Sequence, residues 1–523
     1  MEYLRRLATT GAAYTASSVV SKLIAVFLLP IYTAYLTPSD YGAAEVMLAA
    51  VIAASIVIRF GVIEAILRFY YLAGERPESV VRTGFASLAW TTTAGAAIAL
   101  AFAGPISEAL LEEPDAGLAR LAILGLWTLT LWEFVLTLLH LDERARAYFE
   151  ITVINVVVTI PFTVYLVVVE EMGADGILLG TFGTGAIFLA YRIWVERHRL
   201  SLRPDLPLLR RMVRFGLPTM PAELTLYSLN FIDRIIIVRL AGLAEAGLYA
   251  LAVKFANGLQ VLARGFQLAF PPLAYSISDD DEARDVYALL VTWFAALLAF
   301  AVVGLWLEAR WIVRLLAADT FFEAYEAVGP LATGIALYAL YLAMVVVLGR
   351  TGRTEYGLPA TAAAVVVNIA LNLILVPSEG IVGAAIALVA SYVVVVVLMY
   401  LLTQRLFRVP YEWRRLALIV IAAAALIGLG EAVVPTDGFF GFAGRLVLWL
   451  AFPAVLYALR FLTPDERERL RLLLRPSAIR AGLQRLGREE GPPGGDAPPP
   501  DRRSHGGAVP ETFDQADRDT DRL

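Results

Sequence analysis

The chain has only two lysines, Lys22 and Lys254, and both stand in apolar stretches long enough to cross a membrane. A charge at the centre of a bilayer costs about 2.5–3.5 kcal/mol on insertion scales, so it is expected to face a cavity or a partner. Around the second lysine, polar side chains recur every three or four residues and share one helical face. That stripe consists of Lys254, Asn257, Gln260, Arg264 and Gln267. Ammonium, guanidinium and amide donors together are suited to binding an anion.

The preceding apolar stretch, 215–238, carries a similar stripe, formed by Glu223, Tyr227, Asn230 and Arg234. Lys22 lies at the edge of a face of small and polar residues in the first stretch. Arg59 and Arg68 are further cationic candidates in the second. The residues predicted to bind an anionic substrate are therefore Lys22, Lys254, Arg264, Arg234, Arg68, Arg59 and Asn257. The alternative is that each lysine only pairs with a carboxylate and has a structural role.

Four carboxylates in the apolar stretches are candidates for coupling transport to an ion: Glu64, Asp233, Glu223 and Glu133. An unpaired acid within a membrane is suited to carrying a proton. The favoured alternative is that Asp233 and Glu64 only neutralise adjacent arginines; Glu64 and Arg68, for example, are four residues apart on one helical face. Arg59 lies about 140° from Glu64 on an ideal helix, so these two share a face only if Gly61 bends the span. The pattern leaves coupling to a proton, a sodium ion or the membrane potential open.

Composition identifies the class of protein that must position these residues. Hydrophobic residues make up 59% of the chain and charged residues 17%, against roughly 45–50% and about 25% in soluble domains. This predicts an integral membrane protein. The absence of cysteine excludes disulfides, thiol catalysis and thiolate metal sites. With three histidines and neither a P-loop nor an HExxH motif, the sequence predicts no enzyme, cofactor or metal site.

The apolar stretches predict an all-α protein with about fourteen transmembrane helices, each needing roughly 20 residues. They lie at 12–35, 43–66, 82–104, 117–140, 149–169, 176–196, 215–238, 246–274, 286–307, 327–349, 357–376, 381–403, 413–434 and 442–461. Arginines gather in the even-numbered connections, with Arg310 and Arg314 as the main exceptions. Cytoplasmic loops are enriched in arginine, so both termini are predicted to be cytoplasmic. The expected location is the plasma (inner) membrane.

Glycines recur at nearly constant spacing, which predicts a duplication. Gly42 and Gly247 are 205 residues apart, and Gly173 and Gly380 are 207 apart. An offset of six spans keeps the same orientation, so two six-helix lobes are expected to repeat in parallel. The expected parts are a first lobe at 1–210, a second lobe at 211–404, two further helices at 405–462, an amphipathic cytoplasmic segment at 463–488 and a disordered tail at 489–523.

An ordered series of segments across roughly residues 8–460 carries a resemblance to a known family. It includes LTPSDYG after the first span, GVIEAILRFYY, FGLPTMPAEL, and NLILVPSEGIVGAAIA. The series resembles Wzx-type polysaccharide flippases of the multidrug/oligosaccharidyl-lipid/polysaccharide (MOP) exporter superfamily, which has the MATE-like fold. The resemblance implies alternating access between two six-helix lobes, with helices one, two, seven and eight around a central cavity. It implies an undecaprenyl-diphosphate-linked glycan as substrate, membrane lipid and polysaccharide-assembly proteins as partners, and no nucleic acid.

A peptidoglycan-precursor flippase is compatible with the same resemblance, and two other functions are compatible with parts of the pattern. A drug or cation antiporter of the same superfamily would be favoured by a dominantly acidic cavity, whereas the stripes found here are rich in basic residues. A membrane-embedded glycan polymerase or ligase would need a long outer loop with catalytic groups. The longest predicted outer loop, roughly 308–326, is modest.

Overall fold

The computed structural model describes residues 28–72, 74–353, 357–464 and 466–467. Lys22 and most of the predicted first span lie outside the described residues, as do nearly all of the predicted amphipathic segment at 463–488 and the whole predicted tail at 489–523. The chain forms two compact units, Met1–Phe461 and Leu462–Leu523. Helices α2 to α18 belong to the first unit.

The described residues form helices and no strands, which confirms the predicted all-α class. The α-helices are α2 (Leu29–Tyr35), α3 (Pro38–Arg59), α4 (Val62–Phe69), α5 (Pro77–Ala101), α6 (Ala103–Leu110), α7 (Ala116–Leu141), α8 (Ala145–Val164), α9 (Gly173–Glu196), α10 (Leu206–Gly216), α11 (Met220–Ala241), α12 (Leu243–Ala256), α13 (Gln260–Ser276), α14 (Asp280–Leu316), α15 (Tyr325–Thr351), α16 (Gly357–Leu406), α17 (Trp413–Val433) and α18 (Gly438–Ala458). Short π- or 3-10-helical segments are η1 (Tyr165–Val169), η2 (Leu217–Thr219), η3 (Asn257–Leu259) and η4 (Asp319–Ala324).

Eleven helical stretches among the described residues are long and apolar enough to cross a membrane. One of them, α16, contains two predicted spans, because its backbone leaves the helical conformation at Gly380. Helix α11 is not among the eleven and carries Glu223, Asp233, Arg234 and Arg239. With the second half of α16 and helix α11, these stretches account for thirteen of the fourteen predicted spans, and the first predicted span lies almost wholly outside the described residues.

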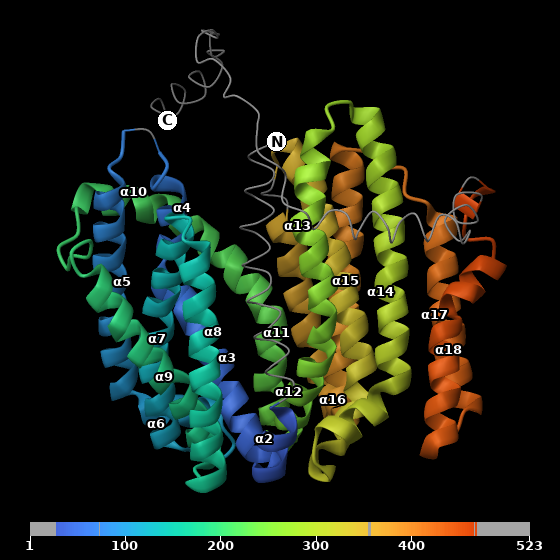
Figure 1. Ribbon diagram of the computed structural model, residues 1–523, viewed down its shortest axis with the longest axis horizontal. Helices are drawn as coiled ribbons and strands as arrows, with labels where there is room; N and C mark the ends of the chain where they lie inside the picture. Colours follow the sequence, from blue (N-terminus) through green and yellow to red (C-terminus); the bar gives the residue numbers. More distant parts are fainter. Residues whose placement is uncertain (1–27, 73, 354–356, 465, 468–523) are drawn as a thin grey trace, which may run out of the picture. The chain divides into compact units, whose positions relative to one another are not determined.

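The helices gather into two lobes and a peripheral pair (Figure 1). In the first lobe α7 packs against α5 and α9, and α8 against α9. In the second lobe α15 and α11 pack along α16, and α14 along α15. Helices α17 and α18 pack on each other and on α14. This is the predicted architecture of two six-helix lobes followed by two helices.

The duplication is visible in backbone geometry. Gly173 and Gly380 both have positive φ angles, of +56° and +53°, which glycine adopts without a side-chain penalty. A methyl group on Gly173 would lie 3.5 Å from a carboxylate oxygen of Asp40, and one on Gly380 would lie 3.2 Å from an oxygen of Glu245. Asp40 and Glu245 are themselves 205 residues apart. Both halves therefore repeat one contact: an acidic residue at the start of a helix, Asp40 of α3 or Glu245 of α12, lies next to a glycine with a positive φ angle.

The two lobes touch where α3 crosses α12. A methyl group on Gly42 would lie 2.2 Å from the carbonyl oxygen of Leu243, and one on Gly247 would lie 2.0 Å from that of Pro38. The two contacts are equivalent under the repeat, because each residue of one pair is 205 residues from its counterpart in the other. Small residues let helix backbones approach closely. The two glycines therefore bring the lobes together next to the short, arginine-poor loops.

The second span is bent at its arginine-rich end, as the sequence allowed. Phe60 and Gly61 adopt left-handed backbone conformations, with φ of 48° and 68°, and separate α3 from α4. A methyl group on Gly61 would lie 1.9 Å from the carbonyl oxygen of Gly216, at the end of α10. The bend therefore packs against the segment that leads into the second lobe.

We predict that Gly247→Ala lowers stability because its methyl group cannot fit without separating α3 from α12. Overpacking of this kind typically costs about 1–3 kcal/mol. Gly258→Ala is the matched control, since nothing lies within 4 Å of the added methyl group there. It should be neutral or slightly stabilising. Thermal unfolding of the purified proteins in detergent measures both, and equal unfolding temperatures would contradict the close crossing.

Candidate functional site

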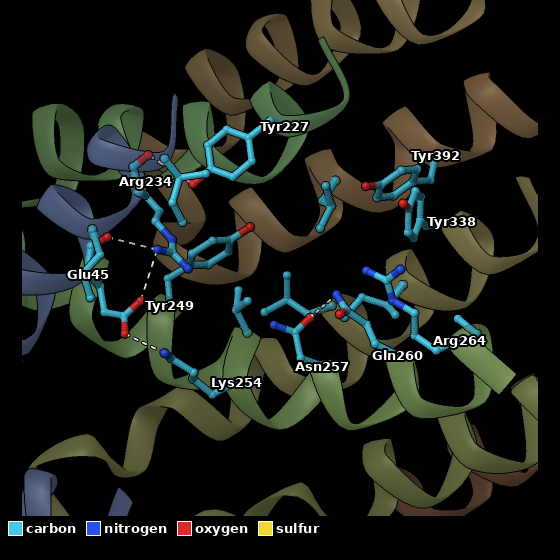
Figure 2. A pocket seen from close by; sticks show the side chains of 18 of the residues that line it. Glu45, Tyr227, Arg234, Tyr249, Lys254, Asn257, Gln260, Arg264, Tyr338 and Tyr392 are labelled. Carbon is cyan, nitrogen blue, oxygen red and sulfur yellow. Dashed lines mark hydrogen bonds and ion pairs between the residues drawn. The ribbon is translucent and has the colours of Figure 1, made fainter. Parts of the chain in front are cut away.

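A cavity of about 570 Å³ lies between α3 of the first lobe and helices of the second lobe. Its walls come from α3, α11, α12, α13, α15 and α16 (Figure 2). The polar and charged residues on these walls are Glu45, Tyr227, Arg234, Tyr249, Lys254, Asn257, Gln260, Arg264, Gln267, Tyr338 and Tyr392. Of the helices expected around the cavity, the second, seventh and eighth contribute to it, and the first is largely undescribed.

The polar stripe predicted around Lys254 lies on the cavity wall. Lys254 is near the end of α12, and Asn257 begins the 3-10 turn η3. The other three, Gln260, Arg264 and Gln267, follow on α13. All five residues line the cavity, and the backbone keeps right-handed helical dihedral angles where η3 joins α12 and α13. Gln260 donates a hydrogen bond to the side-chain oxygen of Asn257, at 2.7 Å.

Glu45 of α3 holds two cations of the opposite lobe at one end of this cavity. Lys254 Nζ lies 2.7 Å from Glu45 Oε1, and Arg234 Nη1 lies 3.2 Å from Glu45 Oε2. Arg234 also donates to the main-chain oxygen of Glu45, at 3.1 Å. Glu45 is 6% exposed. Glu45 is not among the residues predicted from the sequence, although it is the one acidic residue between Asp40 and Glu64 and so stands alone in an apolar run.

Arg264 lies at the other end, beside Tyr338 and Tyr392 (Figure 2). Its side chain is exposed to the cavity. No carboxylate in the described part of the chain forms an ion pair with it, whereas Arg234 and Lys254 share Glu45. The described cavity wall therefore carries one carboxylate, Glu45, against three cations. An excess of positive charge on the wall of a cleft attracts anions.

Two other predicted cationic residues do not line this cavity. Arg59 is 7% exposed and sits between two carboxylates, with Nη1 2.9 Å from Glu133 and Nη2 2.7 Å from Glu223. Arg68 lies over the ring of Phe215, with its guanidinium carbon 4.4 Å from the ring centre. The suggested pair of Arg68 with Glu64 does not form; one oxygen of Glu64 is buried without a hydrogen bond.

Asp233 is fully buried next to the cavity and does not pair with the adjacent Arg234. It accepts hydrogen bonds from the hydroxyl of Tyr249 and from the side-chain nitrogen of Asn372, both at 2.8 Å. Helices α11, α12 and α16 therefore meet at a single carboxylate. Within the described ranges no group of three or more histidine, aspartate or glutamate side chains is arranged to hold a metal ion.

Comparisons with known proteins agree with this architecture. Residues 33–326 match the family described as "Polysaccharide biosynthesis protein". The fold is similar to that of the lipid II flippase MurJ in its inward closed conformation, with a TM-score of 0.67 and 13% identity over 86% of this chain and 99% of that chain. It is also similar to an inward-facing multidrug resistance MATE family transporter of the MOP superfamily, with a TM-score of 0.60 and 17% identity over 74% and 94% of the two chains.

A MOP superfamily transporter from Pyrococcus furiosus is also similar, with a TM-score of 0.51 and 15% identity over 79% of this chain and 94% of that one. At these identities the likeness establishes the fold. The search of curated protein sequences found no match.

We predict that Glu45 and Lys254 are energetically coupled. Removing Glu45 or Lys254 alone leaves the other charge without this partner. The loss of stability in the double variant should therefore be smaller than the sum of the losses in Glu45→Gln and Lys254→Met. Residues in direct contact typically show a coupling free energy of about 0.5–3 kcal/mol. Thermal unfolding of the four proteins in detergent gives this quantity. Strict additivity would mean that the contact contributes nothing to stability.

Proposed function

Since the chain belongs to the polysaccharide biosynthesis protein family, we propose that it moves a lipid-diphosphate-linked oligosaccharide across the plasma membrane by alternating access. The proposed substrate is an undecaprenyl-diphosphate-linked glycan for cell-surface polysaccharide synthesis. The proposed process needs no covalent chemistry. The observation that carries the proposal is Arg264, a cation in the cavity that no carboxylate of the described chain neutralises.

A diphosphate supplies the negative charge that this cavity lacks. Arginine presents a planar fork of donors that matches phosphate oxygens, and lysine presents a mobile point charge. Arg264 is proposed to bind the diphosphate directly, with Lys254 and Arg234 joining when Glu45 withdraws. Asn257, Gln260 and Gln267 offer amide groups suited to sugar hydroxyls, and the tyrosines offer aromatic faces.

The size of the cavity favours a moving structure over a fixed pore. At about 570 Å³ it falls within the range of roughly 300–1,000 Å³ typical of small-molecule pockets. Such a space accepts a headgroup with few sugars, so a longer glycan requires the lobes to separate. The interlobe position of the cavity fits this requirement, because relative movement of α3 against α11 and α12 changes its volume.

The loop charges support an orientation with both termini in the cytoplasm. The two exceptional arginines on the other side, Arg310 and Arg314, lie 3.4 and 3.5 Å from Asp437. A pairing of this kind offsets their positive charge locally. The arginine-rich loops therefore remain the stronger signal for the cytoplasmic side.

We propose that the site that couples transport to its driving force is one of four buried or half-buried carboxylates: Glu64, Asp233, Glu223 and Glu133. A proton, a sodium ion or the membrane potential would each act on such groups. Partners of the proposed process are membrane lipid and polysaccharide-assembly proteins. A drug or cation antiporter fits less well, because the single carboxylate on the described cavity wall, Glu45, already faces two cations.

We predict that Arg264→Met reduces translocation of an undecaprenyl-diphosphate-linked glycan in proteoliposomes. Hydrogen bonds to charged groups contribute about 1.5–3 kcal/mol, which corresponds to roughly ten- to a hundredfold in affinity. Arg264→Lys should retain part of the activity, since it keeps the charge and loses the fork. Arg146→Met is the control, because Arg146 is 91% exposed in a surface pair. Unchanged translocation by Arg264→Met would reject the proposed binding role.

We also predict the topology. A reporter fused after Arg460 should behave as cytoplasmic, and one inserted after Gly173 should behave as external, since arginine-rich loops stay inside. Alkaline phosphatase and green fluorescent protein fusions measure the two compartments. An external reporter after Arg460 would overturn the orientation.

A further inference from the structure

Two residues of opposite charge on helix α3, Glu45 and Arg59, meet the same helix of the other lobe. Glu45 contacts Arg234 near one end of α11, and Arg59 contacts Glu223 near the other. The order of contacts shows that α3 and α11 run antiparallel. At 1.5 Å per residue, the two charges are about 21 Å apart along α3 and their partners about 16 Å apart along α11. The pairs therefore lie at different depths in the membrane.

Each ion pair stands beside a close backbone contact. Glu45 is three residues from Gly42, which touches Leu243 of α12. Arg59 is two residues from Gly61, which touches Gly216 in the segment leading to the second lobe. Between the pairs, Tyr227 of α11 donates a hydrogen bond to the main-chain oxygen of Ala49, at 3.1 Å. Both ends of α3 are thus held against the second lobe.

Building on the proposed function, we propose that the two pairs are interlobe latches that open in turn. The Arg59 latch, Arg59 with Glu223, closes the cavity on the proposed cytoplasmic side. The Glu45 latch, Glu45 with Arg234 and Lys254, closes it on the proposed outer side. The cytoplasmic latch opens without substrate, whereas the outer latch opens only when an anion replaces Glu45 on its two cations.

The Arg59 latch is built to open easily. Arg59 has a second carboxylate partner, Glu133, on α7 of its own lobe. When the lobes separate, Glu133 stays with Arg59 and its charge remains compensated. The departing Glu223 has a side chain that is 39% exposed already, so water reaches it as the lobes part. Opening leaves no buried charge without a partner, which is the costly outcome for an ion pair.

The Glu45 latch is built to resist opening. Its two cations, Arg234 and Lys254, both belong to the second lobe, and the described residues of the first lobe give Glu45 no cation. Separation therefore takes the shared carboxylate away from both cations and leaves Glu45, whose side chain is 8% exposed, without an ion-pair partner among the described residues. A diphosphate on the two cations removes the larger part of this penalty. An empty cavity then stays shut on the outer side, which prevents a leak.

The test uses accessibility of the cavity wall, which is independent of transport. The chain contains no cysteine, so Val253→Cys on the cavity wall provides a single labelling site. A membrane-impermeant maleimide is added to one side or the other of oriented vesicles. Glu223→Gln should raise labelling from the cytoplasmic side by roughly three- to thirtyfold. Glu133→Gln should lower it, because Arg59 then depends on Glu223 alone.

The opposite directions separate a latch from a merely structural ion pair. Both substitutions remove one carboxylate from the same guanidinium and keep the size of the side chain. If the ion pair is only structural, labelling should change in the same direction in both variants or should not change in either variant. Either result would overturn the Arg59 latch. Thermal unfolding of each variant in detergent identifies any protein that fails to fold, in which case Glu223→Asp and Glu133→Asp replace the pair.

The Glu45 latch is tested from the outer side with undecaprenyl diphosphate as the probe. In the Val253→Cys protein, labelling from outside should rise when undecaprenyl diphosphate is present. Glu45→Gln should give high outer labelling without it. Low outer labelling of Glu45→Gln would reject this latch, whatever the substrate. If the variants behave as expected but undecaprenyl diphosphate has no effect on labelling, the latches stand and the proposed substrate is wrong.

Discussion

The cost of leaving a charge without a partner inside a membrane determines the arrangement of this protein more than any other interaction. Arg234, Lys254 and Arg59 all lie at the interface between the lobes, and each meets a carboxylate from the opposite lobe. Because these partners are shared across the interface, movement of the lobes changes charge compensation directly. Of the three cations on the described cavity wall, Arg264 is the one without a carboxylate partner among the described residues.

Helix α3 connects this electrostatic arrangement to the packing of the fold. Its glycine at position 42 allows α12 to approach within backbone contact, and the break at Phe60 and Gly61 turns the chain away at the other end. Close packing of small residues fixes where the two helices cross. The crossing in turn fixes which α3 side chains can reach the second lobe. Both Glu45 and Arg59 occupy such positions.

A shared fold does not fix what is carried. The solved structures with this architecture include a lipid II flippase and a multidrug transporter, at 13% and 17% identity. Function resides in the side chains that line the cavity. Here the described wall has amides, tyrosines and an excess of positive charge. These groups are the basis for proposing an anionic, sugar-bearing ligand rather than a cationic drug.

The sequence by itself determined the helical class, the spans, the duplication and the polar stripe from Lys254 to Gln267. Each of these depends on local periodicity or on a constant offset along the chain, which a single sequence displays. It also identified Gly61 as the residue at which the second span could bend. Only the tertiary structure decided that Glu45 compensates Arg234 and Lys254, that Arg59 pairs with Glu133 and Glu223, and that Asp233 faces Tyr249 and Asn372. Periodicity fixes the face of a helix on which a residue lies, but a partner 164 or 189 residues away depends on how two lobes are rotated and aligned.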